Sequence, residues 1–215
     1  VSLFNRCCIN KDSFTVDATS GTGSATINYY TITLTKDTGI SKVTADGTEN
    51  SKIYLSNQSA NIEATTATGY TFSKWTVTSG NSPASATSRT TTVSASKATT
   101  LKATAVATPY TLTYNPAGGS LEGSTSDVSV SFNVTTNITA KPAATRTGYT
   151  FAGWKVTVPA TSSGGWTTGT VYAGGASIGT GKSANATLTA QWTANTYSVT
   201  YDLGYQSENL LYYNP

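Results

Sequence analysis

An internal duplication is the feature of this sequence that most constrains its fold. The phrase GYTFSKW begins at Gly69, and the phrase GYTFAGW begins at Gly148. A tyrosine-led run with alternating residue types occurs three times, at Tyr30, Tyr110 and Tyr197. Alternation with a period of two is typical of a half-buried strand. The pattern therefore predicts two copies of one β unit, followed by a third opening strand.

The composition favours strands over helices. Charged residues make up only 11% of the chain, and threonine, serine, alanine and glycine fill much of the remainder. Threonine and aromatic residues favour strands, glycine and serine mark turns, and the residues typical of helix surfaces are sparse. The sequence therefore predicts an all-β or β-rich fold, with small tandem repeat domains in an elongated array.

The copies also divide the chain into segments. Residues 30–107 are expected to form the first repeat, and residues 108–194 the second. Residues 1–29 are strand-rich and are expected to form a cap or the end of a preceding unit. Residues 195–215 either open a third unit or supply a donor strand. Linkers of only a few residues leave little freedom, so we expect neighbouring repeats to be semi-rigid relative to each other.

The repeated phrase is expected to be an interior strand. Each large aromatic side chain buries ~150–250 Å² on typical estimates, and a repeat this small has an otherwise marginal core. Strict alternation places Phe151 and Trp154 on opposite faces unless a bulge intervenes, and Gly153 is suited to a bulge. Lys74 stands at the same position in the first copy. A bulge is therefore not expected to be required there.

The second repeat is longer because a glycine-rich segment, residues 162–175, precedes its closing strand. Trp166 and Tyr172 lie in this segment, outside the repeated strands. If they are exposed, they are candidate contacts for a glycan or a protein receptor. For Trp166 the alternative is local packing, which is the commoner role of a lone tryptophan in a loop.

The sequence carries no pattern typical of catalysis. Histidine is absent, which eliminates Ser–His–Asp triads, Cys–His pairs and most zinc sites. The Gly-Lys-Ser that begins at Gly181 lacks the spacing of a phosphate-binding loop. We therefore expect no enzyme activity and no catalytic, cofactor-binding or metal-binding residues. The basic residues are scattered, which argues against a nucleic-acid partner, and no apolar run is long enough to span a membrane.

Two adjacent cysteines, Cys7 and Cys8, leave three interpretations open. They are free thiols, a bond between the two neighbours, or a cross-link to another chain, and the cross-link is the functional interpretation. Four asparagines match the pattern for N-glycosylation, although such matches arise by chance in a chain rich in Asn, Ser and Thr. These asparagines are Asn57, Asn133, Asn137 and Asn185.

The second copy carries a longer pattern around its phrase. GYTFAGW is preceded by KPAATRT and followed by ATLTAQWTANTYSVTY, and residues 110–194 with this pattern resemble the Listeria–Bacteroides repeat, also called the internalin B-repeat (InlB B-repeat). Residues 30–107 resemble a divergent copy, in which Ala105 or Val106 stands near the position of Trp192. The resemblance implies a small β-grasp-like repeat on secreted or surface-anchored microbial proteins. It also implies a role as a stalk, spacer or adhesive segment, and not as an enzyme.

We therefore expect a non-enzymatic structural repeat protein, extracellular or on the cell surface, that forms a stalk or a fibre. Its expected partners are other copies of itself or further repeats of a longer chain. The run with Tyr197, Val199, Tyr201 and Leu203 is a candidate donor strand, because an unpaired strand invites pairing with another chain. In a fragment of a longer array, the same strand opens the next repeat. The competing interpretation is an adhesin module that binds a glycan or host protein through exposed aromatic residues.

Overall fold

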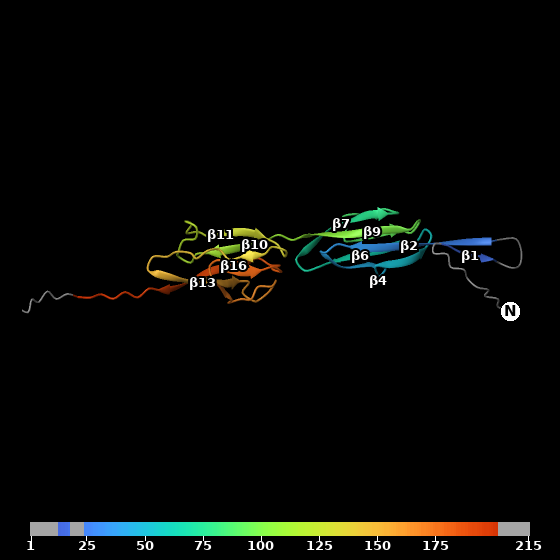
Figure 1. Ribbon diagram of the computed structural model, residues 1–215. Helices are drawn as coiled ribbons and strands as arrows, with labels where there is room; N and C mark the ends of the chain where they lie inside the picture. The colour runs from blue at the N-terminus through green and yellow to red at the C-terminus, as the bar shows by residue number, and fades with distance from the viewer. Residues whose placement is uncertain (1–12, 18–23, 202–215) are drawn as a thin grey trace, which may run out of the picture.

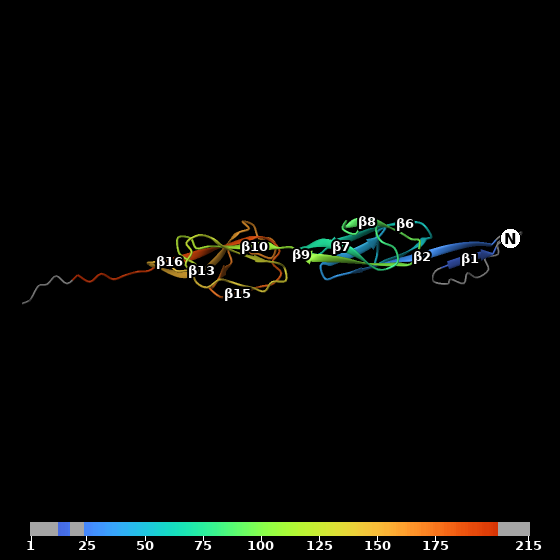
Figure 2. The ribbon, with the colours of Figure 1, turned by 90° about the horizontal axis from the view of Figure 1, so that it is seen from above.

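A computed structural model describes residues 13–17 and 24–201. Their regular secondary structure consists of strands, and these residues contain no helix. Two β units lie end to end along one axis in both views (Figures 1 and 2). A hairpin projects at the N-terminal end, and residues 197–201 extend from the opposite end (Figure 1). The predicted all-β fold with tandem repeat domains is confirmed.

Repeat 1 is built from two sheets. The first has the order β1–β2–β9–β7, with β5 also paired to β2, and the second has the order β4–β3–β6–β8. The strands of the first sheet are β1 (Ser13–Asp17), β2 (Ser24–Lys36), β5 (Ser51–Leu55), β7 (Tyr70–Ser79) and β9 (Thr99–Ala107). Those of the second are β3 (Ile40–Ala45), β4 (Thr48–Glu49), β6 (Ser59–Thr66) and β8 (Thr90–Ser94). Strand β2 runs across the expected boundary at residue 30, and its first half pairs with β1 in the hairpin.

Repeat 2 has one large sheet and one small sheet. The large sheet has the order β11–β10–β16–β13–β14, and β12 pairs with β15 in the small sheet. The large sheet contains β10 (Tyr110–Asn115), β11 (Val128–Phe132), β13 (Tyr149–Val158), β14 (Val171–Tyr172) and β16 (Ala186–Ala194). The small sheet contains β12 (Ile138–Thr139) and β15 (Ser177–Gly179).

The two repeats share one sheet order. In each, the tyrosine-led opening strand lies parallel to the closing strand, so β2 is beside β9 and β10 is beside β16. The neighbours on either side are antiparallel: β5 and β7 in repeat 1, β11 and β13 in repeat 2. This central parallel pair with antiparallel flanks is the β-grasp arrangement of strands. The chain thus enters and leaves each repeat on adjacent strands that run in the same direction.

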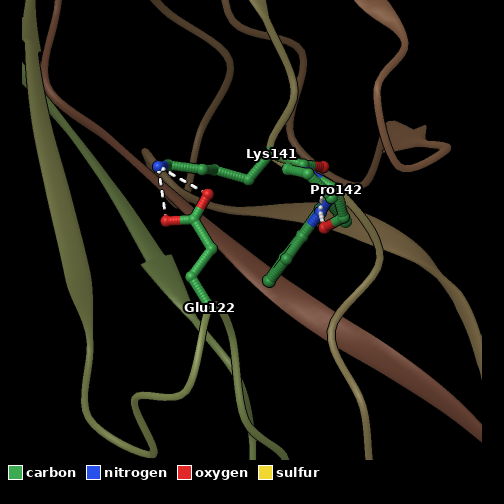
Figure 3. A network of polar contacts seen from close by, with 4 residues as sticks. Glu122, Lys141 and Pro142 are labelled. Carbon is green, nitrogen blue, oxygen red and sulfur yellow. Dashed lines mark hydrogen bonds and ion pairs between the residues drawn. The ribbon is translucent and has the colours of Figure 1, made fainter.

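The tryptophan of the repeated phrase anchors the core of each unit. Trp75 is 2% exposed and Trp154 is 0% exposed. Each indole N–H donates a hydrogen bond to a backbone carbonyl: that of Ser88 in repeat 1 (3.1 Å) and that of Lys141 in repeat 2 (3.0 Å). The Lys141 ammonium pairs in turn with the carboxylate of Glu122 at 2.7 Å (Figure 3). Buried indoles are tolerated here because their polar edge has a partner.

A β-bulge follows the phenylalanine of the phrase in both copies. The register shifts between Phe72 and Lys74 in β7, and between Phe151 and Gly153 in β13. The extra residue brings phenylalanine and tryptophan to the same face, where their ring centroids lie 5.9 Å apart in repeat 1 and 5.2 Å apart in repeat 2. The expectation that repeat 1 needs no bulge was therefore wrong, because its core requires both aromatic residues on one face.

The backbone conformation and the neighbouring strand explain why only the second bulge contains glycine. Gly153 has a φ of 132°, and an added Cβ would lie 2.5 Å from a side-chain carbon of Val171 in β14. Repeat 1 has no counterpart of β14 among its described strands, and Lys74 is exposed there. The positive φ of this bulge and the close approach of an edge strand therefore both require glycine, whereas Lys74 is not among the residues with a positive φ.

Candidate functional site

Trp166 lies in the core of repeat 2 and not on its surface. Its side chain is 1% exposed, its indole N–H donates to the carbonyl of Ala184 (2.9 Å), and its ring meets Phe132 edge to face at 6.0 Å. Tyr172, on β14, is half-buried against the same core. Two roles were left open for Trp166, a ligand contact if the side chain is exposed and local packing. The structure shows local packing, because the inserted segment turns this side chain inward.

The other predicted site residues are scattered over the molecule. Asn133 is half-buried, and its side-chain oxygen accepts hydrogen bonds from the backbone N–H (3.0 Å) and hydroxyl (2.7 Å) of Thr135. The exposed asparagines are Asn57, Asn137 and Asn185. Glycosylation at the four sites stays a prediction. Three predicted residues lie outside the described ranges: Cys7, Cys8 and Leu203.

The candidate donor strand is extended and exposed. Tyr197, Val199 and Tyr201 are 75%, 72% and 83% exposed. In repeat 2 the counterparts of Val199 and Tyr201 are Leu112, at 0%, and Tyr114, at 1%. The counterpart of Tyr197 is Tyr110, which is partly buried against the core. Among the described residues, this segment therefore carries the apolar face of an opening strand without a sheet to cover it.

Both repeats hold their exit linker in the same way. The backbone N–H of Thr108 donates to the carbonyl of Gly69, and that of Asn195 donates to the carbonyl of Gly148, each at 2.9 Å. In each repeat, the threonine two residues after this glycine adds a side-chain contact to the linker, of 2.8 Å in repeat 1 and 2.7 Å in repeat 2. The chain therefore leaves both units along the same path.

Repeat 2 packs against repeat 1 at the first of these glycines. An added Cβ on Gly69 would lie 2.8 Å from the Cβ of Val134, which belongs to the loop after β11. Gly69 also has a φ of 82°, so both its conformation and the close approach of Val134 require glycine. The carbonyl of Val134 accepts a hydrogen bond from the N–H of Gly181 (2.8 Å), which fixes the loop.

The corresponding end of repeat 2 is uncovered among the described residues. Gly148 has a φ of 79°, yet nothing lies within 4 Å of an added Cβ. A hollow of about 620 Å³ is lined by Thr147 and Tyr149, which stand on either side of Gly148 in the sequence, and by Gly118 and Arg146. We call this surface the open end, and define it by Gly118, Arg146, Gly148, Tyr149 and Asn195.

Different aromatic residues fill the corresponding position in the two repeats. In repeat 1 the ring of Tyr70 lies over Gly39, 2.5 Å from where a Cβ would be. In repeat 2 the ring of Trp192 lies over Gly119 in the same manner, at 2.4 Å, and its indole N–H donates to the carbonyl of Pro116 (3.1 Å). Each glycine thus makes room for one aromatic ring, supplied by a different strand in each unit.

The tryptophan changes the position of the tyrosine at the open end. Because Trp192 covers Gly119, Tyr149 lies elsewhere: its ring centroid is 4.0 Å from the guanidinium carbon of Arg146, and the residue is 38% exposed. Arg146 also donates to the carbonyl of Ala117 (3.2 Å). The strand register makes Ala105 the counterpart of Trp192. The sequence showed that repeat 1 lacks this tryptophan. It did not show that the tyrosine of the repeated phrase would fill the space over the glycine in repeat 1 and remain outside it in repeat 2.

Among the described residues of repeat 1, one carboxylate has a shifted pKa, that of Asp46 in the turn between β3 and β4. Asp46 accepts hydrogen bonds from the hydroxyl of Tyr54 (2.7 Å) and from the side chain (2.9 Å) and backbone N–H (3.1 Å) of Asn61. Burial raises the pKa of Asp46, but these hydrogen bonds outweigh burial and hold the pKa below its ordinary value. Burial and the adjacent carboxylate both raise the pKa of Tyr54. The pair ties a turn to the sheet and has no partner typical of catalysis beside it.

The open end favours contact with another β unit over chemistry. It presents one guanidinium, an aromatic ring and glycine backbone, and its hollow is otherwise lined by hydroxyl side chains and alanine. The described residues include no group of three or more His, Cys, Asp or Glu side chains that could hold a metal ion. They also form no helix with the length and apolar character needed to cross a membrane.

Two family models match the chain. Residues 110–191 match the Listeria-Bacteroides repeat domain, and residues 30–107 match the Divergent InlB B-repeat domain. No curated protein matches the chain. The two matches adjoin at the linker that carries the Thr108 hydrogen bond, and together they cover both β units.

Proposed function

Because the chain belongs to the Listeria–Bacteroides repeat and divergent InlB B-repeat families across residues 30–191, we propose that it is a load-bearing spacer in a stalk on a microbial cell surface. These families are non-catalytic structural repeats typical of bacterial surface proteins, which supports an extracellular repeat role. The observation that carries the mechanical proposal is the parallel pairing of the first and last strands of each repeat.

Tension along the chain loads this parallel pair in shear. In repeat 2, a pull on the linker before Tyr110 acts on the start of β10, and a pull after Ala194 acts on the end of β16. The strands run side by side in the same direction, so the two forces slide one strand past the other. Their hydrogen bonds then resist together, whereas bonds at the open end of a hairpin break one after another.

The buried side chains also oppose sliding. Leu112 and Tyr114 of β10 and Leu188 of β16 are at most 1% exposed and share one core. A slip of one residue moves such a set of side chains to the opposite face of the sheet. Sliding therefore disrupts the hydrogen bonds and the core at the same time, which favours a high resistance along the stalk axis.

Single-molecule force spectroscopy tests this proposal. Handles placed before Tyr30 and after Asn195 should give two unfolding events, one for each repeat. Handles at Pro109 and Thr135 are the matched control, because they pull the antiparallel strands β10 and β11 apart from one end. We expect unfolding at clearly lower force in this control. Equal forces in the two geometries would contradict a shear-resistant spacer.

A fibre formed by strand donation is the second candidate function. The exposed apolar face of residues 197–201 favours it, because an unpaired strand completes a sheet in another subunit with backbone hydrogen bonds. Cys7 and Cys8 would then cross-link neighbouring subunits. Electron microscopy should show filaments for the chain and none after deletion of residues 197–215. Sedimentation of the intact chain as a monomer at high concentration counts against donation. The adhesin interpretation loses its main residue, because Trp166 is buried.

A further inference from the structure

We propose that the open end of repeat 2 is a docking surface for a third repeat of this chain, which begins with the strand at Tyr197. The proposal rests on the spacer function and adds to it a defined junction between successive units. The third repeat would sit on Gly148 as repeat 2 sits on Gly69. Three independent features of the described residues support this assignment.

The first feature is the path of the chain. The linker hydrogen bond at Gly69 recurs at Gly148 with the same length, and the threonine contact to the linker recurs as well. Two residues, 108–109, separate β9 from β10, and two residues, 195–196, separate β16 from the tyrosine-led run at Tyr197. A third unit would therefore begin at the same place relative to repeat 2 as repeat 2 begins relative to repeat 1.

The second feature is that the surface around Gly69 is buried by a neighbouring repeat, whereas the equivalent surface around Gly148 is exposed. At the end of repeat 1, Ala107 and Thr108 are half-buried and Gly69 is in contact with Val134. At the end of repeat 2, Ala194 and Asn195 are exposed, and no described atom lies within 4 Å of a Cβ added to Gly148. The same type of surface is thus occupied once and uncovered once within one chain.

The third feature is the exposed tyrosine-led run at Tyr197. Tyr197, Val199 and Tyr201 repeat the alternation of β2 and β10, whose inward residues lie in the cores of their units. Three large apolar side chains, each more than 70% exposed, require a core to cover them. The further strands of a third repeat would supply that core, and its loop corresponding to the one that carries Val134 would face Gly148.

The docking contact at the new junction differs from the first in one respect. The loop of the third repeat would meet the Arg146–Tyr149 pair, whereas the corresponding tyrosine of repeat 1 is turned over Gly39. The hollow of about 620 Å³, which Arg146 and Tyr149 line, leaves room for a side chain of that loop. We therefore expect the second junction to be as ordered as the first, with a different set of contacts.

The test uses a three-unit chain, in which residues 1–196 are followed by a second copy of residues 110–201. Cys7 and Cys8 are replaced by serine, and one pair of spin labels is placed in each of two samples: at the exposed positions Glu49 and Asp127 in the first, and at Asp127 and its copy in the second. Double electron–electron resonance then measures the label distance across each junction separately. We expect equally narrow distance distributions at both junctions.

Val134 supplies the discriminating variants. Val134→Asp in the third unit should broaden only the second distribution towards that of a flexible linker, and the same change in the second unit should broaden only the first. Asn137→Asp is the matched control, because Asn137 is exposed on the same loop, and it should leave both distributions narrow. Circular dichroism of each variant confirms that all units remain folded.

Two results would overturn the proposal. A broad second distribution in the unmodified three-unit chain would show that the open end does not dock a folded repeat. Sedimentation of that chain as an oligomer, with the strand paired between molecules, would assign the surface to a second copy instead. Neither result alters the force measured within a single repeat, so failure here is distinguishable from failure of the spacer function.

Discussion

At the scale of single residues, the two repeats solve one packing problem with different aromatic side chains. The space above the turn glycine is filled by Tyr70 in repeat 1 and by Trp192 in repeat 2. Repeat 1 has Ala105 where repeat 2 has Trp192, so its tyrosine is free to turn inward. The absence of a tryptophan side chain from β9 is thus offset by the inward position of the tyrosine side chain on β7. The fold therefore tolerates sequence divergence between the two repeats.

This exchange predicts the behaviour of repeat 2 after truncation of its tryptophan. Trp192→Ala should cost less than the ~3–5 kcal/mol typical of a buried tryptophan, because Tyr149 turns inward to fill the space. Trp192→Ala combined with Tyr149→Ala should cost more than the sum of the single changes. Denaturant unfolding with hydrogen exchange at β16 measures these losses for repeat 2 alone. Additive losses would show that the tyrosine does not compensate.

The Asp46–Tyr54 pair predicts an acid-dependent part of the stability of repeat 1. The folded pKa of Asp46 is depressed below its ordinary value of 3.8. Its contribution is therefore present above the unfolded pKa and is lost as pH falls through the folded pKa. Asp46→Asn should be less stable than the parent at neutral pH, and this difference should shrink below pH 3.8. Denaturant unfolding of both chains across this range measures it, and a constant difference would contradict the assignment.

At the scale of elements, period-two alternation predicted the strands correctly. The tyrosine-led runs at Tyr30 and Tyr110 lie in β2 and β10, and the repeated phrases form β7 and β13. These are local patterns, so the sequence shows them directly. The third run, at Tyr197, forms no strand over its described residues 197–201. The bulges were harder to predict, because they depend on which face the core requires. Local packing of Trp166 was one of two roles left open, and its partners Phe132 and Ala184 were not predictable, because they are distant in sequence.

The inserted segment is therefore predicted to stabilise repeat 2 and not to bind a ligand. Trp166→Ala removes a buried indole and should cost about 3–5 kcal/mol. Trp166→Phe keeps part of the packing but loses the hydrogen bond to the carbonyl of Ala184, so it should cost less than the alanine variant. Thermal unfolding of repeat 2 measures both losses. An unchanged unfolding temperature for Trp166→Ala would contradict a core role.

At the scale of the whole molecule, the duplication predicted the tandem architecture, and the short linkers predicted restricted motion between units. The contact that fixes the junction was not predictable. Gly69 and Val134 lie in different repeats, and no local pattern marks either residue as a docking partner. Gly69 and Gly148 occupy the same position of the repeated phrase and have similar φ angles. Among the described residues, only Gly69 has a neighbouring repeat packed against it. The function of such a glycine depends on what packs against the end of its repeat.

This difference predicts unequal effects of the same substitution. Alanine at either glycine is strained by the positive φ, at a cost on the order of 1 kcal/mol. Gly69→Ala also forces its new Cβ against Val134, so it should cost more and loosen the junction between repeats. Gly148→Ala should leave that junction intact. Denaturant unfolding measures the two costs, and spin-label distances between the repeats report the junction.

The extra cost of Gly69→Ala has an upper limit, because the repeats separate once the clash exceeds their docking free energy. The loss beyond that of Gly148→Ala therefore estimates how strongly the units dock. The double variant Gly69→Ala with Val134→Gly removes the clashing valine side chain and should restore the narrow distance distribution, provided that the loop keeps its hydrogen bond from Gly181. If both single variants leave the distribution unchanged, the contact does not restrict the junction, and the linker hydrogen bonds at Thr108 alone determine its stiffness.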